Sequence, residues 1–206
     1  MGRYLIIPFV AVIICIFGGV LSAILGEIVL SIPANISWDM GLIIGLILGI
    51  LFLRKATGLH LPILPAKKDG YRKVIEYSLL AALSIIVVNL SMEYVQSGGF
   101  SFGYEPQLPK TGDVFGLLSV LIFAPVLEEL FFTGYLYVYI RDNIGIGAAV
   151  TIVSVLFYFG HEANSLHLMT SFLLIYVFEK TSYLSSSIFT HMIWNTYVVL
   201  SNMLPE

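Results

Sequence analysis

The chain has 206 residues, of which 58% are hydrophobic and only 11% are charged, and its mean hydropathy is +0.94. Charged residues make up about a quarter of a typical soluble domain, so this composition excludes a soluble globular protein and predicts a membrane protein. The net charge of −3, without a basic patch, gives no indication of a nucleic-acid partner. Apolar stretches take up most of the sequence, so a single integral membrane domain is expected over residues 1–206.

Seven apolar stretches predict an all-α protein with about seven transmembrane helices, because a helix needs about 20 residues to cross about 30 Å of hydrocarbon. The first stretch is longer than the roughly 7–15 apolar residues of a signal peptide, which favours a helix there. The sixth stretch is the shortest. The expected spans are Tyr4–Ile32, Trp38–Leu53, Val74–Gln96, Val114–Ile140, Gly147–Asn164, Leu166–Phe178 and Leu184–Leu204.

The distribution of basic residues predicts the orientation in the cell membrane. If the N-terminus is cytoplasmic, every lysine and arginine except Lys110 falls on the cytoplasmic side, as the positive-inside rule requires. The C-terminus is then external. The main cytoplasmic connection is expected between Arg54 and Lys73, where Pro62 and Pro65 prevent a helix. The main external connection is expected over residues 97–112.

Two adjacent glutamates, Glu128 and Glu129, lie inside the fourth expected span. An ionised carboxylate within the bilayer costs several kcal/mol, so an intramembrane acid is a candidate for a functional site with a partner nearby. Taken alone, this pair is equally compatible with an ion-pair partner or with an acid that lines the cavity of a transporter.

Further polar residues follow on the later spans. His161 ends the segment Phe157-Tyr158-Phe159-Gly160-His161, and His191 and Asn195 lie one turn apart on the same face of the seventh span. The expected spans place Glu128, His191 and Asn195 near the middle of the membrane, with His161 somewhat nearer the external side. These side chains can therefore converge on one buried cavity, although each alone is equally typical of polar contacts between helices.

The ordered set of motifs resembles the CAAX protease and bacteriocin-processing family, also called the Abi family, which includes the Ras-converting CAAX endopeptidase. The family motifs are Glu-Glu-x-x-x-Arg, Phe-x-x-x-His and His-x-x-x-Asn. The resemblance covers roughly Pro125 to Val199, within a catalytic half of about residues 113–204. One position departs from the pattern, because Thr133 stands where the first motif has arginine. Arg141 lies about two turns further on, near the cytoplasmic end, and cannot take over that role.

The resemblance implies an intramembrane glutamate-type endopeptidase that works without a metal or another cofactor. In that assignment Glu128 and His161 bind and activate a water molecule, and Glu129 assists or orients them. His191 and Asn195 form the oxyanion hole, where donors fixed in a dry cavity stabilise a developing negative charge. The implied partner is a peptide or protein substrate in or at the membrane, and prenylated substrates are not distinguished from other peptides.

Three other readings stay open at the level of sequence. The loss of the motif arginine at Thr133 also fits a catalytically inactive family member that acts as a membrane scaffold or regulator of a partner protein. A transporter usually shows broken helices in two related halves, and Pro125 alone does not make that pattern.

A zinc peptidase is the third reading. It would show His-Glu-x-x-His on one helix, whereas in this chain His167 follows His161 two residues too late, so its side chain is expected to face elsewhere. His167 and His60 are expected in or beside loops. Cys15 is the only cysteine, which excludes a cysteine metal site.

Overall fold

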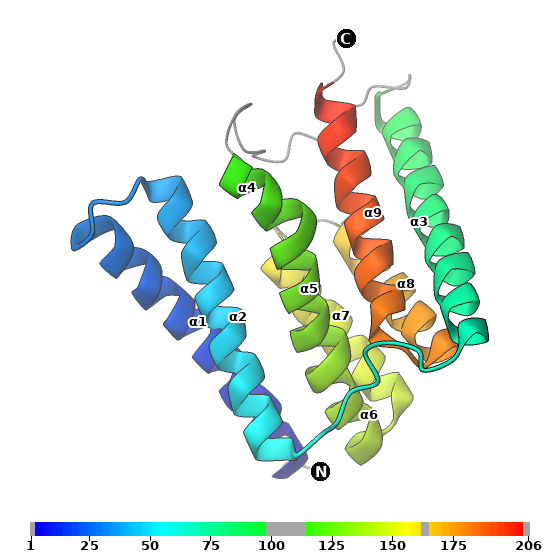
Figure 1. Ribbon diagram of the computed structural model, residues 1–206, viewed down its shortest axis with the longest axis horizontal. Helices are drawn as coiled ribbons and strands as arrows, with labels where there is room; N and C mark the ends of the chain where they lie inside the picture. Colours follow the sequence, from blue (N-terminus) through cyan, green and yellow to red (C-terminus); the bar gives the residue numbers. More distant parts are fainter. Residues whose placement is uncertain (1–2, 98–113, 162–164, 204–206) are drawn as a thin grey trace. The chain divides into compact units, whose positions relative to one another are not determined.

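The computed structural model describes residues 3–97, 114–161 and 165–203, and every regular element within these ranges is a helix (Figure 1). The prediction of an all-α protein is therefore confirmed for this part of the chain. The elements are α1 (Arg3–Ile28), α2 (Ala34–Thr57), α3 (Lys68–Ser97), α4 (Val114–Leu118), the π-helix η1 (Ser119–Phe123), α5 (Ala124–Glu129), the π-helix η2 (Leu130–Tyr137), α6 (Val138–Ile144), α7 (Ile146–Gly160), α8 (Ser165–Thr181) and α9 (Leu184–Met203).

The expected cytoplasmic connection is shorter than its composition indicated. Helix α2 continues to Thr57 and α3 begins at Lys68, so only residues 58–67 are non-helical. The basic residues at these helix ends suit helical turns, because long cationic side chains keep their charge at the aqueous end and favour a helix C-terminus. Gly58 ends α2 with a φ of +66°, and its N–H donates to the carbonyl of Arg54 at 3.0 Å. Of the expected external connection over residues 97–112, Ser97 is the last residue of α3, and residues 98–112 lie outside the described residues.

Four helical segments are long and apolar enough to cross a membrane, namely Tyr4–Ile28, Ile36–Thr57, Lys68–Met92 and Val114–Ile144. The last is a continuous helix from α4 to α6. Helix α7 is apolar but shorter, with 15 residues, α8 has 17 residues, and α9 carries many hydroxyl and amide side chains. The chain is thus a membrane protein, and the expected count of seven spans stays a prediction.

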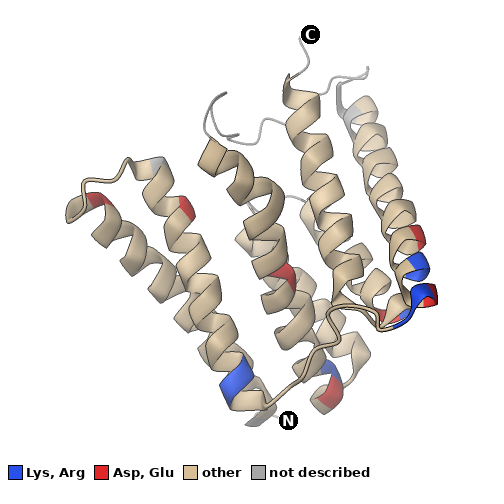
Figure 2. Cartoon of the chain, viewed as in Figure 1, with Lys and Arg blue, Asp and Glu red and all other residues tan. Residues whose placement is uncertain are grey.

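Charged side chains keep mainly to the ends of the helices (Figure 2). The basic residues of α2, α6 and α8 lie in the last helical turn of each. Helix α5 is different because it carries acidic residues within the long helix Val114–Ile144 (Figure 2). This placement sets the two glutamates of α5 apart from the charges at the helix ends.

The chain folds as two compact units, each described here by itself. The first comprises Met1–Leu61 and Ile122–Val153, and the second comprises Pro62–Leu121 and Ser154–Glu206. The long helix Val114–Ile144 begins in the second unit and continues into the first. These units do not coincide with the expected catalytic half, and the prediction of one integral membrane domain stays a prediction.

In the first unit, glycines let helices approach closely. A side chain at Gly45 of α2 would make its Cβ clash with the carbonyl oxygen of Cys15 on α1, so only glycine allows this contact. One turn further along α2, Gly49 accommodates the ring of Phe131, to which a Cβ at this position would be 2.6 Å away. Phe131 is 1% exposed and lies in η2, so this contact holds the segment that follows the two glutamates against α2.

In the second unit, hydroxyl side chains join α3, α8 and α9. Ser78 of α3 donates to the carbonyl of Ser186 on α9 at 2.9 Å, and Ser187 donates to the carbonyl of Leu174 on α8 at 2.8 Å. Small hydroxyl residues allow such close helix contacts in an apolar environment. An apolar cluster of Ile85, Leu166, Trp194 and Val198 lies in the same unit. This packing positions α9, which carries His191 and Asn195.

Candidate active site

Glu128 and Glu129 end α5, a stretch of six residues between two π-helices. Both side chains are buried, with 7% and 0% exposure. Wide π-turns are rare and occur frequently at functional sites. The preceding π-helix has a cause in the sequence, because Pro125 lacks an N–H and so removes a donor from the helical ladder. The two adjacent acids are therefore buried in a short α-helical stretch that has a departure from regular α-helix on either side.

Thr133 lies one turn after Glu129 and contacts it directly. Its Oγ1 donates a hydrogen bond to Oε2 of Glu129 at 2.7 Å, and Thr133 itself is only 2% exposed. A hydroxyl thus contacts Glu129 from the position where the motif has arginine. Arg141 does not serve there, since it lies in the last turn of α6 and pairs with Asp142 at 3.0 Å. The ion pair between Arg141 and Asp142 agrees with the expectation that Arg141 cannot replace the motif arginine.

His161 follows the last residue of α7, and its ring is held by Phe157 of that helix. Nδ1 of His161 lies 2.9 Å from the carbonyl oxygen of Phe157, and the two rings stack with centroids 4.1 Å apart and an interplanar angle of 19°. A carbonyl oxygen can only accept, so Nδ1 is the donor. In the neutral ring Nε2 then carries the lone pair, which is the form needed to accept a proton or to hold a water molecule.

Phe157 also contacts the second motif histidine. Its ring is 1% exposed and lies edge-on to His191 of α9, with centroids 5.9 Å apart. His191 is itself 4% exposed. The phenylalanine of the Phe-x-x-x-His motif thus has a physical role, because it packs between two histidines that are 30 residues apart in the sequence. Within the second unit, His161 and His191 therefore both contact the ring of Phe157.

Asn195 is half-buried on α9 and donates from Nδ2 to the carbonyl oxygen of Val120 in η1 at 2.9 Å. In a π-helix this carbonyl would accept the N–H of residue 125, but Pro125 has none. Asn195 therefore supplies a donor to a turn that lacks one. Because the partner is a carbonyl, the side-chain amide must present its nitrogen, and a second hydrogen on Nδ2 remains to donate.

The expectation that His167 faces away from His161 is wrong. The two rings lie with centroids 4.9 Å apart at 41°, and His167 is 8% exposed in the first turn of α8. The expectation applied the His-Glu-x-x-His spacing rule, which holds within one helix, whereas α7 ends at Gly160 and α8 begins at Ser165. Two separate helices can face each other at any spacing. His167 is the site neighbour that the motif pattern missed.

The candidate residues are divided between the two units. Glu128 and Glu129 belong to the first unit, and His161, His191 and Asn195 belong to the second. Convergence of all five on one cavity stays a prediction. Within the described residues there is no group of three or more His, Cys, Asp or Glu side chains placed to hold a metal ion.

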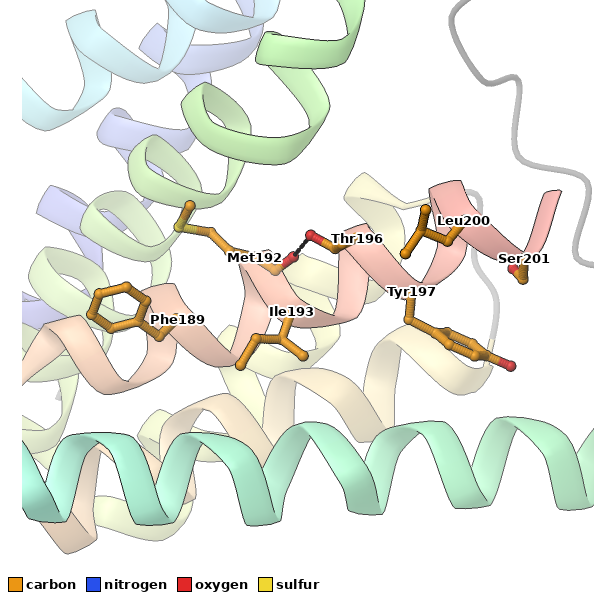
Figure 3. A pocket seen from close by; sticks show the side chains of 7 residues that line it. All are labelled: Phe189, Met192, Ile193, Thr196, Tyr197, Leu200 and Ser201. Carbon is orange, nitrogen blue, oxygen red and sulfur yellow. Dashed lines mark hydrogen bonds between the residues drawn. The ribbon is translucent and has the colours of Figure 1, made fainter. Parts of the chain in front are cut away.

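An open apolar groove of about 550 Å³ runs along α9 (Figure 3). Its side chains recur every three or four residues along one face of the helix, and Thr196 donates to the carbonyl of Met192 at 2.7 Å. His191 and Asn195 each precede a groove residue and lie on the adjacent helix face, so the groove is not the candidate site itself. It is lined by Phe189, Met192, Ile193, Thr196, Tyr197, Leu200 and Ser201.

Residues 110–197 match the family model described as type II CAAX prenyl endopeptidase, Rce1-like. This match confirms the resemblance to the CAAX protease family that the three motifs indicated. It includes Glu128, Glu129, His161, His191 and Asn195, whereas α1 to α3 lie outside it. No curated protein and no solved structure matches the chain.

Proposed function

We propose that this chain, whose residues 110–197 place it with the CAAX proteases, is an intramembrane endopeptidase that hydrolyses peptide bonds of membrane-associated peptides or proteins. The observation that carries the proposal is that all five motif residues fall within the matched segment. Their types supply a base, a water-binding group and two donors, which are the components that attack on a peptide carbonyl needs.

In the proposed mechanism Glu128 and His161 bind a water molecule, and Glu128 takes its proton as the oxygen attacks the scissile carbonyl carbon. The fixed Nδ1–H of His161, which donates to Phe157, supports this role because it leaves Nε2 to hold the water. Glu129 orients Glu128 and the water molecule, and Thr133 donates a hydrogen bond to Glu129. A metal ion is not part of this proposal.

His191 and Asn195 are proposed to stabilise the oxyanion of the tetrahedral intermediate. His191 is buried beside Phe157, and Asn195 presents an amide nitrogen with a second hydrogen beyond the one given to Val120. One donor of this kind is typically worth about 3 kcal/mol of transition-state stabilisation. Proton return from the protonated Glu128 to the leaving amine completes the hydrolysis.

The test is cleavage by the purified protein of a peptide library that contains farnesylated peptides ending in a CAAX box and the same peptides without the lipid. Activity should survive a chelator and should be lost in Glu128→Gln at unchanged folded yield. Glu76→Gln is the matched control, because Glu76 is exposed and paired with Arg72. Loss of activity on chelation, restored by added zinc, would replace this mechanism with a metal-dependent one.

The second candidate is a catalytically inactive family member that acts as a membrane scaffold or regulator of a partner protein. The observation in its favour is Thr133, since a threonine cannot supply the positive charge of the motif arginine. A folded protein that cleaves no peptide in the library, and whose cellular role survives Glu128→Gln, would favour this second candidate.

A further inference from the structure

His167 lies in the first turn of α8, a helix that is joined to α7 by a buried hydrogen bond. His167 and Ser171 are four residues apart and therefore share one face of α8. Ser171 donates from its Oγ to the Oγ of Ser154 on α7 at 3.1 Å, and both serines are almost completely buried. The ring of His167 lies 4.9 Å from that of His161, just past the end of α7. The same face of α8 thus makes a buried hydrogen bond to α7 and a ring contact with His161 just beyond the end of α7.

His161 needs such a contact because it lies beyond regular helix. Its backbone N–H donates to the carbonyl of Tyr158 at 3.2 Å, in a turn rather than in an α-helical bond. The ring is held on one side by the hydrogen bond and the stacking with Phe157, and both of these come from its own helix. His167 adds a contact from a second helix, and it is buried enough to hold a fixed position.

We infer that His167 is a positioning residue that fixes the imidazole plane of His161 from α8. The inference rests on the proposed function, in which His161 holds the water molecule and the orientation of its ring therefore matters. His167 acts through the packing of its ring and takes no part in bond making. A flat side chain of similar size at this position should therefore preserve the effect, and a small one should not.

The first experiment compares His167→Ala, His167→Phe and Ser171→Ala in the purified full chain with a quenched fluorescent farnesylated CAAX-box peptide. His167→Ala should lower kcat by about 10- to 100-fold with little change in KM, since a misplacement of about 1 Å can cost about 100-fold. His167→Phe should restore kcat to near that of the wild type. Ser171→Ala removes the neighbouring contact on the same helix face and should leave kcat unchanged.

Three outcomes of this experiment contradict the inference. The first is an unchanged kcat in His167→Ala. The second is a kcat for His167→Phe that is no better than for His167→Ala at equal folded yield, because packing would then not be what matters. The third is an equal loss of kcat in Ser171→Ala, because any damage to the contact between α7 and α8 would then have the same effect.

A second experiment separates this inference from the proposed function. The chain has four histidines, so ¹⁵N-histidine labelling in nanodiscs gives a spectrum that single substitutions can assign. The His161 signals should show protonated Nδ1 in the wild type, should shift in His167→Ala, and should be unmoved in Ser171→Ala. If the wild type cleaves no peptide, the proposed function fails while this result still decides the role of His167. Identical His161 signals in the wild type and in His167→Ala would overturn the inference.

Discussion

Thr133 donates a hydrogen bond to Glu129 at 2.7 Å, across one turn of the helix and in a buried environment. A neutral hydroxyl therefore makes a contact from the position that arginine occupies in the motif. Removing one partner of a buried hydrogen bond typically costs about 1–3 kcal/mol, so the threonine contributes a substantial interaction although it adds no positive charge. The residue that departs from the motif is therefore in direct contact with Glu129.

Replacing Thr133 tests the importance of this contact. Thr133→Val keeps the shape of the side chain and removes the donor, so it should lower the free energy of unfolding by about 1–3 kcal/mol and reduce cleavage by about tenfold or more. Thr133→Ser keeps the hydroxyl and should retain most of the activity. Thermal unfolding in detergent and the turnover of a CAAX-box peptide are the measurements.

The control for this substitution is Thr151→Val. Thr151 is an exposed threonine whose hydroxyl bonds only to a backbone carbonyl of its own helix, that of Gly147 at 2.9 Å. Thr151→Val should leave both thermal unfolding and peptide turnover near the wild-type values. If Thr133→Val behaves like Thr151→Val, the bond to Glu129 has no role in activity.

The contact between Asn195 and Val120 leads to a second prediction. Asn195→Ala should lower kcat by about 100- to 1,000-fold if the amide donates to the oxyanion, and Asn195→Asp should be as inactive because a carboxylate cannot donate. The matched control is Asn202→Ala on the same helix, since Asn202 also donates to a backbone carbonyl, that of Val198 at 2.8 Å. Near-normal kcat for Asn195→Asp would show that catalysis needs no donor at this position, and would contradict the oxyanion role.

Topology gives a third prediction, which rests on the basic residues. Four segments satisfy the length and composition of a membrane span. The positive-inside asymmetry predicts a cytoplasmic N-terminus and an external C-terminus. Ends on opposite sides require an odd number of crossings. Reporter fusions at Pro62 and at the C-terminus should therefore report the cytoplasm and the exterior respectively. Both reporters on one side of the membrane would contradict the count of seven spans.

The helices were largely predictable from the sequence because long apolar runs leave the backbone little alternative in lipid. Their ends were less predictable, as at Lys68, where a charged turn continues α3 beyond its apolar part. The contact between His161 and His167 was mispredicted because a spacing rule for one helix was applied to residues of two different expected spans, and sequence spacing does not determine how two helices face each other. The bond from Asn195 to Val120 joins residues 75 positions apart, and no local pattern indicates it.

The last prediction separates the enzyme from the scaffold in cells. If the motif residues act as one catalytic unit, Glu128→Gln and His161→Ala should each cost orders of magnitude in cleavage, and the double variant should cost little more. The proteins should still accumulate, because polar contacts between membrane helices average only about 0.6 kcal/mol. A scaffold would instead tolerate these changes and respond to substitutions on exposed faces, such as Leu80→Ala on α3, where the side chain is 62% exposed. Variants should be compared at equal expression for the phenotype of a deletion strain. A normal phenotype for Glu128→Gln, beside a defective one for Leu80→Ala, would reject proteolysis as the physiological role.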